Sequence, residues 1–248
     1  MKKKFSLPLL AVAILFSSIS DAQTFSLGVR SGLSIPNLTA GSGSETNPLN
    51  TGYKSRLGPD EAIFGEYHLS SLFSLEAMIE FSSQGGKKTG LQAFPNPQGM
   101  PTYLYADFKS VAKFNYLLVP VLAKFGWKLS SHSPIRVYFG AGPFAGFLLS
   151  AHQITSGSSA TFLDPQGTTP IAPSSSFDRN TDIKDQLNTL NFGVSGNVGF
   201  AYNFAKSNIF IEGGGNYGFR DIQKGTANGK NRVGAGTVAL GYAYTFGK

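Results

Sequence analysis

Apolar and small polar residues alternate in successive segments along most of this chain. The connections between these segments are alternately short and long. The alternation is clearest in residues 73–81, FSLEAMIEF, where the odd-numbered positions are apolar and the even-numbered ones include two glutamates. A period of two is that of a β-strand, because successive side chains of a strand point to opposite faces. The pattern therefore predicts an all-β fold.

The N-terminus has the three parts of a secretory signal peptide. Residues 2–4 are lysines, residues 7–16 are almost wholly apolar, and a short sequence of small residues ends at Ala22. A membrane anchor, the alternative, would need about 20 apolar residues. We expect residues 1–22 to be a signal peptide and residues 23–248 to form a single barrel domain.

The composition argues against a soluble protein. Cysteine is absent, so disulfide bonds contribute nothing to stability. Glycine accounts for 30 of 248 residues, whereas roughly 7% is usual, and charged residues account for 14%, whereas about a quarter is usual. A soluble protein with so few charged residues would have difficulty covering its surface.

Eight segments have the length and alternation expected of strands. They cover approximately residues 24–34, 61–69, 72–83, 108–127, 134–149, 190–203, 208–221 and 232–246. The connections near residues 70–71, 128–133 and 205–207 are short, and the others are longer and rich in Gly, Ser, Thr, Asn and Pro. An even number of strands with short turns on one side and long loops on the other is typical of outer-membrane barrels. We therefore expect an eight-stranded antiparallel up-and-down transmembrane β-barrel.

Two segments fit the pattern less well. Ile63 and Phe64 are both apolar and interrupt the alternation of the second segment, which predicts a β-bulge there. The fourth segment is apolar on both faces and contains Pro120, which cannot donate a hydrogen bond to a neighbouring strand. The pattern leaves the register of this fourth segment open.

Alternation alone does not say whether the apolar face points outward to lipid or inward to a core. A soluble lipocalin-like barrel would hold a hydrophobic ligand inside and expose its polar face. Here the polar face is mostly Gly, Ser, Asn, Thr and Ala, whereas a water-facing surface would carry many more Lys and Glu residues. Small residues with a few compensating charges suit the narrow interior of an eight-stranded barrel. The charged residues expected in that interior are Arg30, Glu76, Glu80, Arg136, Glu212 and Arg220.

Aromatic residues near the strand ends favour the outward placement of the apolar face, because membrane barrels carry aromatic girdles at both interfaces. The aromatic residues in question are Phe25, Phe73, Phe81, Phe125, Trp127, Tyr202, Tyr217, Phe219, Tyr244 and Phe246.

Several strings point to one family. They are FSLEAMIEFSSQGGK, NYLLVPVLAKFG, YFGAGPFAGFLL, NFGVSGNVGFAY and the C-terminal GYAYTF. Over essentially the whole of residues 23–248, the chain resembles the PorT-like outer-membrane β-barrel family of Bacteroidota. The resemblance implies the architecture and the outer membrane as location. It assigns no activity, because the part that PorT members take in assembling a secretion system belongs to particular members.

The residues that could carry chemistry do not converge in this topology. His68 is expected near a strand end, His132 in a short turn and His152 at the start of a long loop, whereas a metal site needs convergent ligands. Ser150 lies close to His152, as in a lipid-modifying hydrolase, but neither an oriented base nor an oxyanion site is visible. We therefore predict no catalytic, cofactor-binding or metal-binding residues, and a protein that is not an enzyme.

Basic residues are frequent in the long connections. They include Lys54, Arg56, Lys87, Lys88, Lys224 and Lys230. At the outer surface they would complement the phosphates of lipopolysaccharide. We expect outer-membrane lipid, lipopolysaccharide and envelope proteins as partners, no nucleic acid, and a monomer. The leading hypothesis is a structural or interaction barrel whose lumen is filled by side chains; a small-solute pore, a lipid-modifying enzyme and a soluble ligand binder are the alternatives.

Overall fold

The computed structural model describes residues 24–40, 46–225 and 229–247. The predicted signal peptide lies outside these residues. The described residues form β-strands and one short 3-10 helix, η1. In chain order they are β1 (Thr24–Ala40), β2 (Gly58–His68), β3 (Phe73–Pro95), β4 (Tyr103–Lys128), β5 (Ile135–Ser156), β6 (Ser158–Phe162), β7 (Pro170–Ser176), β8 (Arg179–Asp182), η1 (Lys184–Gln186), β9 (Leu190–Phe204), β10 (Ser207–Gly218) and β11 (Asn231–Phe246). Among these residues, no helix is both long and apolar enough to cross a membrane.

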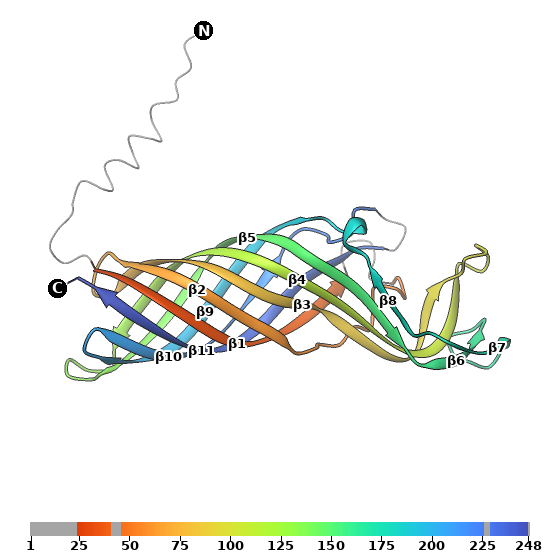
Figure 1. The fold of residues 1–248 in the computed structure, drawn as a ribbon, viewed down its shortest axis with the longest axis horizontal. Helices are drawn as coiled ribbons and strands as arrows, with labels where there is room; N and C mark the ends of the chain where they lie inside the picture. Colours follow the sequence, from red (N-terminus) through yellow and green to blue (C-terminus); the bar gives the residue numbers. More distant parts are fainter. Residues whose placement is uncertain (1–23, 41–45, 226–228, 248) are drawn as a thin grey trace, which may run out of the picture.

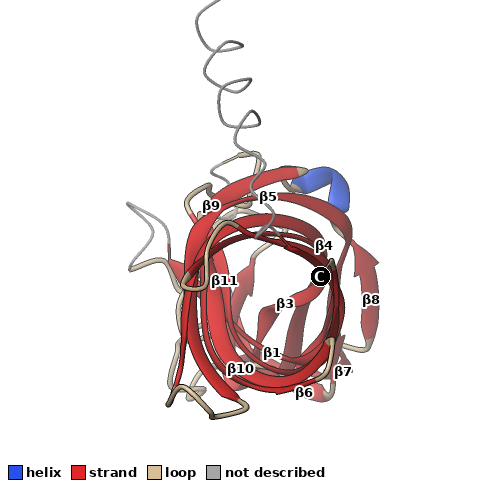
Figure 2. Ribbon diagram, turned by 90° about the vertical axis from the view of Figure 1, so that its left-hand side faces the viewer, coloured by secondary structure: helices blue, strands red, loops and turns tan. Residues whose placement is uncertain are grey.

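Eight of the strands close into a ring in the order β1, β2, β3, β4, β5, β9, β10, β11. The ring closes where β11 pairs with β1, from Phe25 opposite Phe246 to Ala40 opposite Asn231. All of its ladders are antiparallel, as predicted. The closed ring is seen along its axis in Figure 2, and Figure 1 shows that the C-terminal end lies beside the start of β1.

Three further strands lie outside the ring, so the sheet has eleven strands rather than the predicted eight. β6 pairs with β4 and β7, and β8 pairs with β5. They lie between the fifth and sixth predicted strands, in a region expected from its sequence to be a long loop. β7 and β8 are exposed at every position, and all three strands are short, so they lack the apolar alternation that identifies the ring strands.

The connection predicted for residues 84–105 is also mostly strand. β3 and β4 continue as a paired hairpin that projects beyond the ring (Figure 1), with Gln84 opposite Phe114 and Pro95 opposite Tyr103. The β3 half of this hairpin is rich in glycine and lysine, which is why its sequence resembles a loop, whereas the β4 half carries a buried apolar row that includes Leu104, Ala106 and Phe108. The long connections lie at the end of the ring from which the hairpin projects, called here the long-loop end; the opposite end is the short-turn end.

The predicted bulge at Ile63 and Phe64 is wrong. β2 keeps an unbroken register with both neighbours, and the alternation is interrupted in sequence only because Phe64 is a large apolar residue that points inward. An irregular register occurs instead between Asn115 and Tyr116 of β4. Pro120 does lie within β4, where pairing with β3 is absent between Leu118 and Val121, consistent with its missing N–H group.

The outward faces of the ring strands are largely apolar, as predicted, and the inward faces are mostly small or polar but also hold large residues such as Phe64, Leu122 and Phe210. Leu27, Val29, Ile79, Val198 and Leu240, for example, are about half exposed or more, at 50%, 53%, 51%, 54% and 65%. Glu61 of β2 is a charged exception on this outward face, opposite Ser31 and Phe81.

Two inward glycines make room for aromatic rings in the narrow lumen. A β-carbon on Gly28 would lie 2.2 Å from the ring of Phe64, and one on Gly241 would lie 2.1 Å from the ring of Phe210. Phe64 and Phe210 in turn meet edge to face, with 5.7 Å between their centroids. Any larger residue at either glycine would displace a ring that fills the interior.

Outward aromatic residues gather toward both ends of the ring. At the short-turn end, Phe125 contacts Phe73 and Phe139, with ring centroids 5.0 and 5.4 Å apart. Toward the long-loop end, Phe219 contacts Phe192 and Tyr217 at 6.4 and 6.1 Å. Two aromatic zones that bound an apolar belt are the arrangement expected at the two interfaces of a bilayer.

Candidate functional site

Arg30 of β1 lies inside the ring and contacts three carboxylates. Its Nη2 atom lies 2.8 Å from Glu80 Oε2 and 3.3 Å from Asp60 Oδ1, and its Nη1 atom donates a hydrogen bond to Glu212 Oε1. All four side chains are buried. The three carboxylates come from β2, β3 and β10, so one guanidinium group connects strands from opposite sides of the lumen.

A second buried cation extends this cluster toward the short-turn end. Lys124 Nζ lies 2.7 Å from Glu76 Oε2 and 3.0 Å from Glu66 Oε2. The same ammonium group lies 4.4 Å from the ring centroid of Tyr138. Because the Tyr138 hydroxyl donates a hydrogen bond of 2.8 Å to Glu212 Oε2, the two clusters form one network.

The network occupies the cross-section of the lumen. Asn197 of β9 also donates to Glu212, at 3.2 Å, so seven of the eight ring strands contribute a side chain. Apolar side chains surround the ions: Ala62, Phe64, Met78, Leu122, Ala201, Phe210 and Ala243. Buried charges are stable only when they are paired and hydrogen-bonded. The closed ring should therefore lose stability if one member of the network is removed.

Four of the six predicted interior charges belong to this network: Arg30, Glu76, Glu80 and Glu212. Arg136 is partly buried and lies with His68 at the short-turn mouth of the lumen. The prediction for Arg220 is wrong. β10 ends at Gly218, so the alternation no longer applies, and Arg220 is exposed and donates to Asn188 Oδ1 at 3.2 Å.

Asp60, Glu66 and Lys124 complete the network and are not among the charges predicted from the sequence. Asp60 and Glu66 lie on β2. The bulge wrongly predicted there left open which of its residues point inward. Lys124 lies on β4, whose register was open because Leu118 and Leu122 point inward beside it. Strict alternation along β2 could have identified Asp60 and Glu66. Both lie an even number of residues from Ala62, which points inward, so they share its face.

Two further layers close the lumen above the network. Gln84 Nε2 of β3 donates to Asn216 Oδ1 of β10 at 3.0 Å. An apolar layer lies beside this amide pair and includes Tyr116, Leu118 and Phe144, each at most 5% exposed; Leu118 pairs directly with Glu80 of the network.

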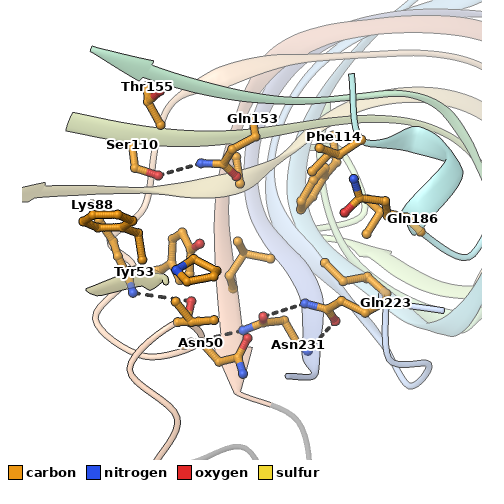
Figure 3. A pocket seen from close by; sticks show the side chains of 18 of the residues that line it. Asn50, Tyr53, Lys88, Ser110, Phe114, Gln153, Thr155, Gln186, Gln223 and Asn231 are labelled. Carbon is orange, nitrogen blue, oxygen red and sulfur yellow. Dashed lines mark hydrogen bonds between the residues drawn. The ribbon is translucent and has the colours of Figure 1, made fainter. Parts of the chain in front are cut away.

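A cavity of about 510 Å³ opens above the apolar layer, at the long-loop end (Figure 3). Its apolar part is formed by Leu38, Phe114, Leu187 and Ile222, together with Phe94 and Phe108 of the projecting hairpin. Its polar part carries Lys88 and Lys224 and several side-chain amides: Asn50, Gln92, Gln153, Gln186, Gln223 and Asn231. Some of the amides are already satisfied, since Gln223 donates to Asn231 at 2.8 Å and Gln153 to Ser110 at 2.6 Å.

Lys88 is the buried cation of this cavity, with 8% of its surface exposed. Its Nζ atom donates to the carbonyl oxygen of Pro48 at 2.8 Å and lies 4.6 Å from the ring centroid of Tyr53. No carboxylate forms an ion pair with it among the described residues. Burial lowers the pKa of Lys88 to about 8.

Four lysines form a basic patch on the outside of the projecting hairpin: Lys54, Lys87, Lys109 and Lys113. Lys54 and Lys87 are paired directly, with backbone hydrogen bonds of 2.8 and 2.9 Å in both directions. Lys109 and Lys113 flank Val111, the β4 residue opposite Lys87. Like charges on directly paired residues repel each other, and in the described part of the chain no carboxylate pairs with these lysines.

The predicted histidines and Ser150 do not converge on one another, although His68 Nδ1 lies 3.6 Å from Glu66 Oε1 at the edge of the ionic network. His68 contacts Ser26 Oγ at 2.9 Å, His132 is exposed in a short turn, and His152 lies on β5. The Ser150 hydroxyl accepts a hydrogen bond of 2.9 Å from Asn115, rather than contacting His152. Within the described residues, no group of three or more His, Cys, Asp or Glu side chains could hold a metal ion.

A closed antiparallel ring with an apolar outer belt, aromatic zones at both ends and a buried ionic interior defines a membrane-spanning β-barrel. Comparison with known families agrees. The model of the outer membrane protein beta-barrel domain matches residues 18–224, and the chain therefore belongs to that family. The protein is an outer-membrane barrel.

Several solved outer-membrane proteins are similar to this chain at low identity. OprG from Pseudomonas aeruginosa is 11% identical, with 92% of this chain and 98% of that chain covered and a TM-score of 0.45. Neisserial surface protein A is 11% identical, with 90% and 97% covered and a TM-score of 0.39. Ail of Yersinia pestis, in complex with the heparin analogue sucrose octasulfate, is 12% identical, with 90% and 99% covered and a TM-score of 0.37. No curated protein matches this chain.

Proposed function

We propose that this protein is a non-enzymatic interaction barrel, sealed through its lumen, that meets its partners at the long-loop end. The observation that carries the proposal is the network around Arg30 and Lys124, which crosses the lumen and is covered by an apolar layer. An eight-stranded ring has an interior that side chains can fill, leaving little room for a water path. By the usual orientation of such barrels, the long-loop end faces the outside of the cell.

The sealed lumen predicts that the purified barrel does not conduct. Inserted into planar lipid bilayers at neutral pH, it should give no stepwise single-channel current in simple salt solution, because ions would have to displace buried ion pairs. A barrel of similar size with a known open lumen, reconstituted in parallel, controls for insertion. Reproducible ohmic steps from the wild-type protein would favour the small-solute pore instead.

The basic patch supports lipopolysaccharide as a partner. Lys87 points outward immediately beyond the apolar belt, opposite Lys54, and the two ammonium groups need a counter-ion between them. A phosphate group provides that charge with several acceptor oxygens. We propose that these lysines bind phosphate groups of the outer leaflet. We also propose that the protein is a monomer, since pairing of β1 with β11 leaves no free strand edge in the ring.

Replacing Lys87 by Met should weaken binding to lipopolysaccharide by about 1 kcal/mol, or roughly fivefold, with a similar loss for Lys54→Met. The measurement is the affinity of the refolded barrel for vesicles that contain lipopolysaccharide, compared with vesicles that contain its dephosphorylated form. Lys128→Met is the matched control, because Lys128 is exposed at the opposite, short-turn end of the ring. Equal affinities for the two kinds of vesicle would contradict phosphate recognition.

A further inference from the structure

The cavity at the long-loop end combines an apolar part with a cationic part. At about 510 Å³ it falls within the range of small-molecule sites, roughly 300–1,000 Å³. The chain thereby offers, in one enclosed space, the two environments that a molecule with an oily tail and a charged head requires. We propose that this cavity binds a single-chain anionic amphiphile, with its headgroup at Lys88 and its chain along the apolar side chains.

The charge of the headgroup follows from the two lysines. Lys88 Nζ donates to the carbonyl oxygen of Pro48, and Lys224 Nζ donates to that of Asp185 at 2.9 Å. Neither amine has a carboxylate partner, and no Asp or Glu is among the described residues that line the cavity. A buried cation such as Lys88, which is held by carbonyl dipoles and the Tyr53 ring but by no carboxylate among the described residues, is stabilised further by an anion. A cationic or neutral headgroup would lack this gain.

The chain of the ligand follows from the aromatic wall. Phe94 and Phe108 line the cavity, and behind them Phe177 stacks on Phe108, with centroids 4.7 Å apart and planes 3° from parallel. Phe177 also contacts Phe94 at 5.6 Å, so the three rings support each other. A flexible acyl chain can cover this wall and the apolar layer below it, and each buried methylene group contributes about 0.8 kcal/mol. The inference extends the proposed function by naming a ligand class for the outer end.

Titration of Lys88 gives the site a pH dependence. Burial lowers the pKa of Lys88 to about 8, so its amine is charged below that pH and loses its charge as the pH rises through it. The other ionisable groups that line the cavity are Tyr53, whose pKa is raised by burial, and the exposed Lys224. A carboxylate ligand stays ionised throughout this range. Binding should therefore be stronger below the pKa of Lys88 than above it.

The test uses short, soluble amphiphiles with different headgroups. Octanoate, octanol and octyltrimethylammonium are titrated by calorimetry into the barrel held in phosphatidylcholine nanodiscs, with empty nanodiscs subtracted. Octanoate should bind at least about tenfold more tightly than octanol, as expected for a charge-assisted hydrogen bond, and the cation should bind most weakly. Equal binding of the three compounds, or no binding of octanoate, would overturn the proposal without requiring any variant.

Lys88→Met then locates the headgroup. This substitution keeps most of the apolar stem. It should reduce the affinity for octanoate to that for octanol. It should also abolish the pH dependence, so that octanoate binds equally well about one pH unit below and about one unit above the wild-type pKa of Lys88. Lys87→Met, in the adjacent outward position, should change neither. Gel mobility before and after heating verifies that both variants are folded. A Lys88→Met barrel that is folded and binds octanoate as tightly as the wild type would refute the assignment.

The source of the ligand is a separate outcome. Mass spectrometry of lipids that copurify with the wild-type barrel, but not with Lys88→Met, distinguishes a chain drawn from the outer leaflet from a free fatty acid. Either identity supports the site. The conductance measurement tests the sealed lumen and does not depend on ligand binding. Channel current would contradict the proposed function, whereas a lack of octanoate binding would contradict only the ligand site.

Discussion

Arg30→Met is expected to lower the free energy of unfolding of the barrel by about 3–5 kcal/mol, the usual result of removing one partner from a buried ion pair. The variant leaves Asp60, Glu80 and Glu212 together in the lumen without the guanidinium group that separates them. Their mutual repulsion adds to the cost of burying unpaired carboxylates. The measurement is urea unfolding in lipid vesicles, followed by the heat-modifiable mobility of the folded barrel.

Arg220→Met is the matched control, since Arg220 is exposed beyond the end of β10. It should change the free energy of unfolding by no more than about 0.5 kcal/mol. Arg30→Lys should fall between the two, because an ammonium group keeps the charge but cannot form the same fork of hydrogen bonds. If Arg30→Met unfolds at the same urea concentration as the wild type, the network does not hold the ring together.

Val198→Arg is expected to cost about 2–4 kcal/mol of stability in a bilayer. Val198 is 54% exposed on the outward face, midway along β9 between the aromatic residues Phe192 and Phe204. This position places the introduced charge near the middle of the apolar belt, where the cost of a cation in lipid is greatest. Urea unfolding in vesicles again measures the effect.

Leu91→Arg provides the corresponding control. Leu91 is also an outward aliphatic residue, but it belongs to the projecting part of β3 and lies opposite Asp107. Arginine there meets water and a carboxylate, so the change in stability should stay within about 1 kcal/mol. Equal costs at Val198 and Leu91 would show that the belt is not surrounded by lipid.

The ring strands could be predicted because a membrane barrel makes strict demands on them. Lipid on one side and a narrow interior on the other force an alternation that is visible in β9, where Phe192, Val194 and Val198 point outward and Asn197 inward. The short turns and the outward faces of the ring strands other than β2 and β4 followed from this pattern. The projecting hairpin and β6 to β8 did not, because strands that lie outside the bilayer are free of that constraint.

The interior site was predicted in part. Arg30 and Glu212 stand out because they are charged residues at positions that match the inward face of clearly alternating strands. Lys124 and Asp60 did not stand out, because the lumen also contains large apolar side chains such as Phe64 and Leu122. Where both faces of a strand are apolar, alternation no longer tells the inside from the outside.

The sequence by itself determined that the chain is a β-barrel with an apolar exterior and a sparsely charged interior, because a period of two divides the residues between two faces and the polar face has too few charges to meet water. Only the tertiary structure decided which charges meet. Arg30 and Glu212 are 182 residues apart, and their contact depends on the closure of the ring and on the register of every ladder between them. The same holds for the outer cavity, where side chains from β1, β3, β4, β5 and the long connections are brought together by the fold.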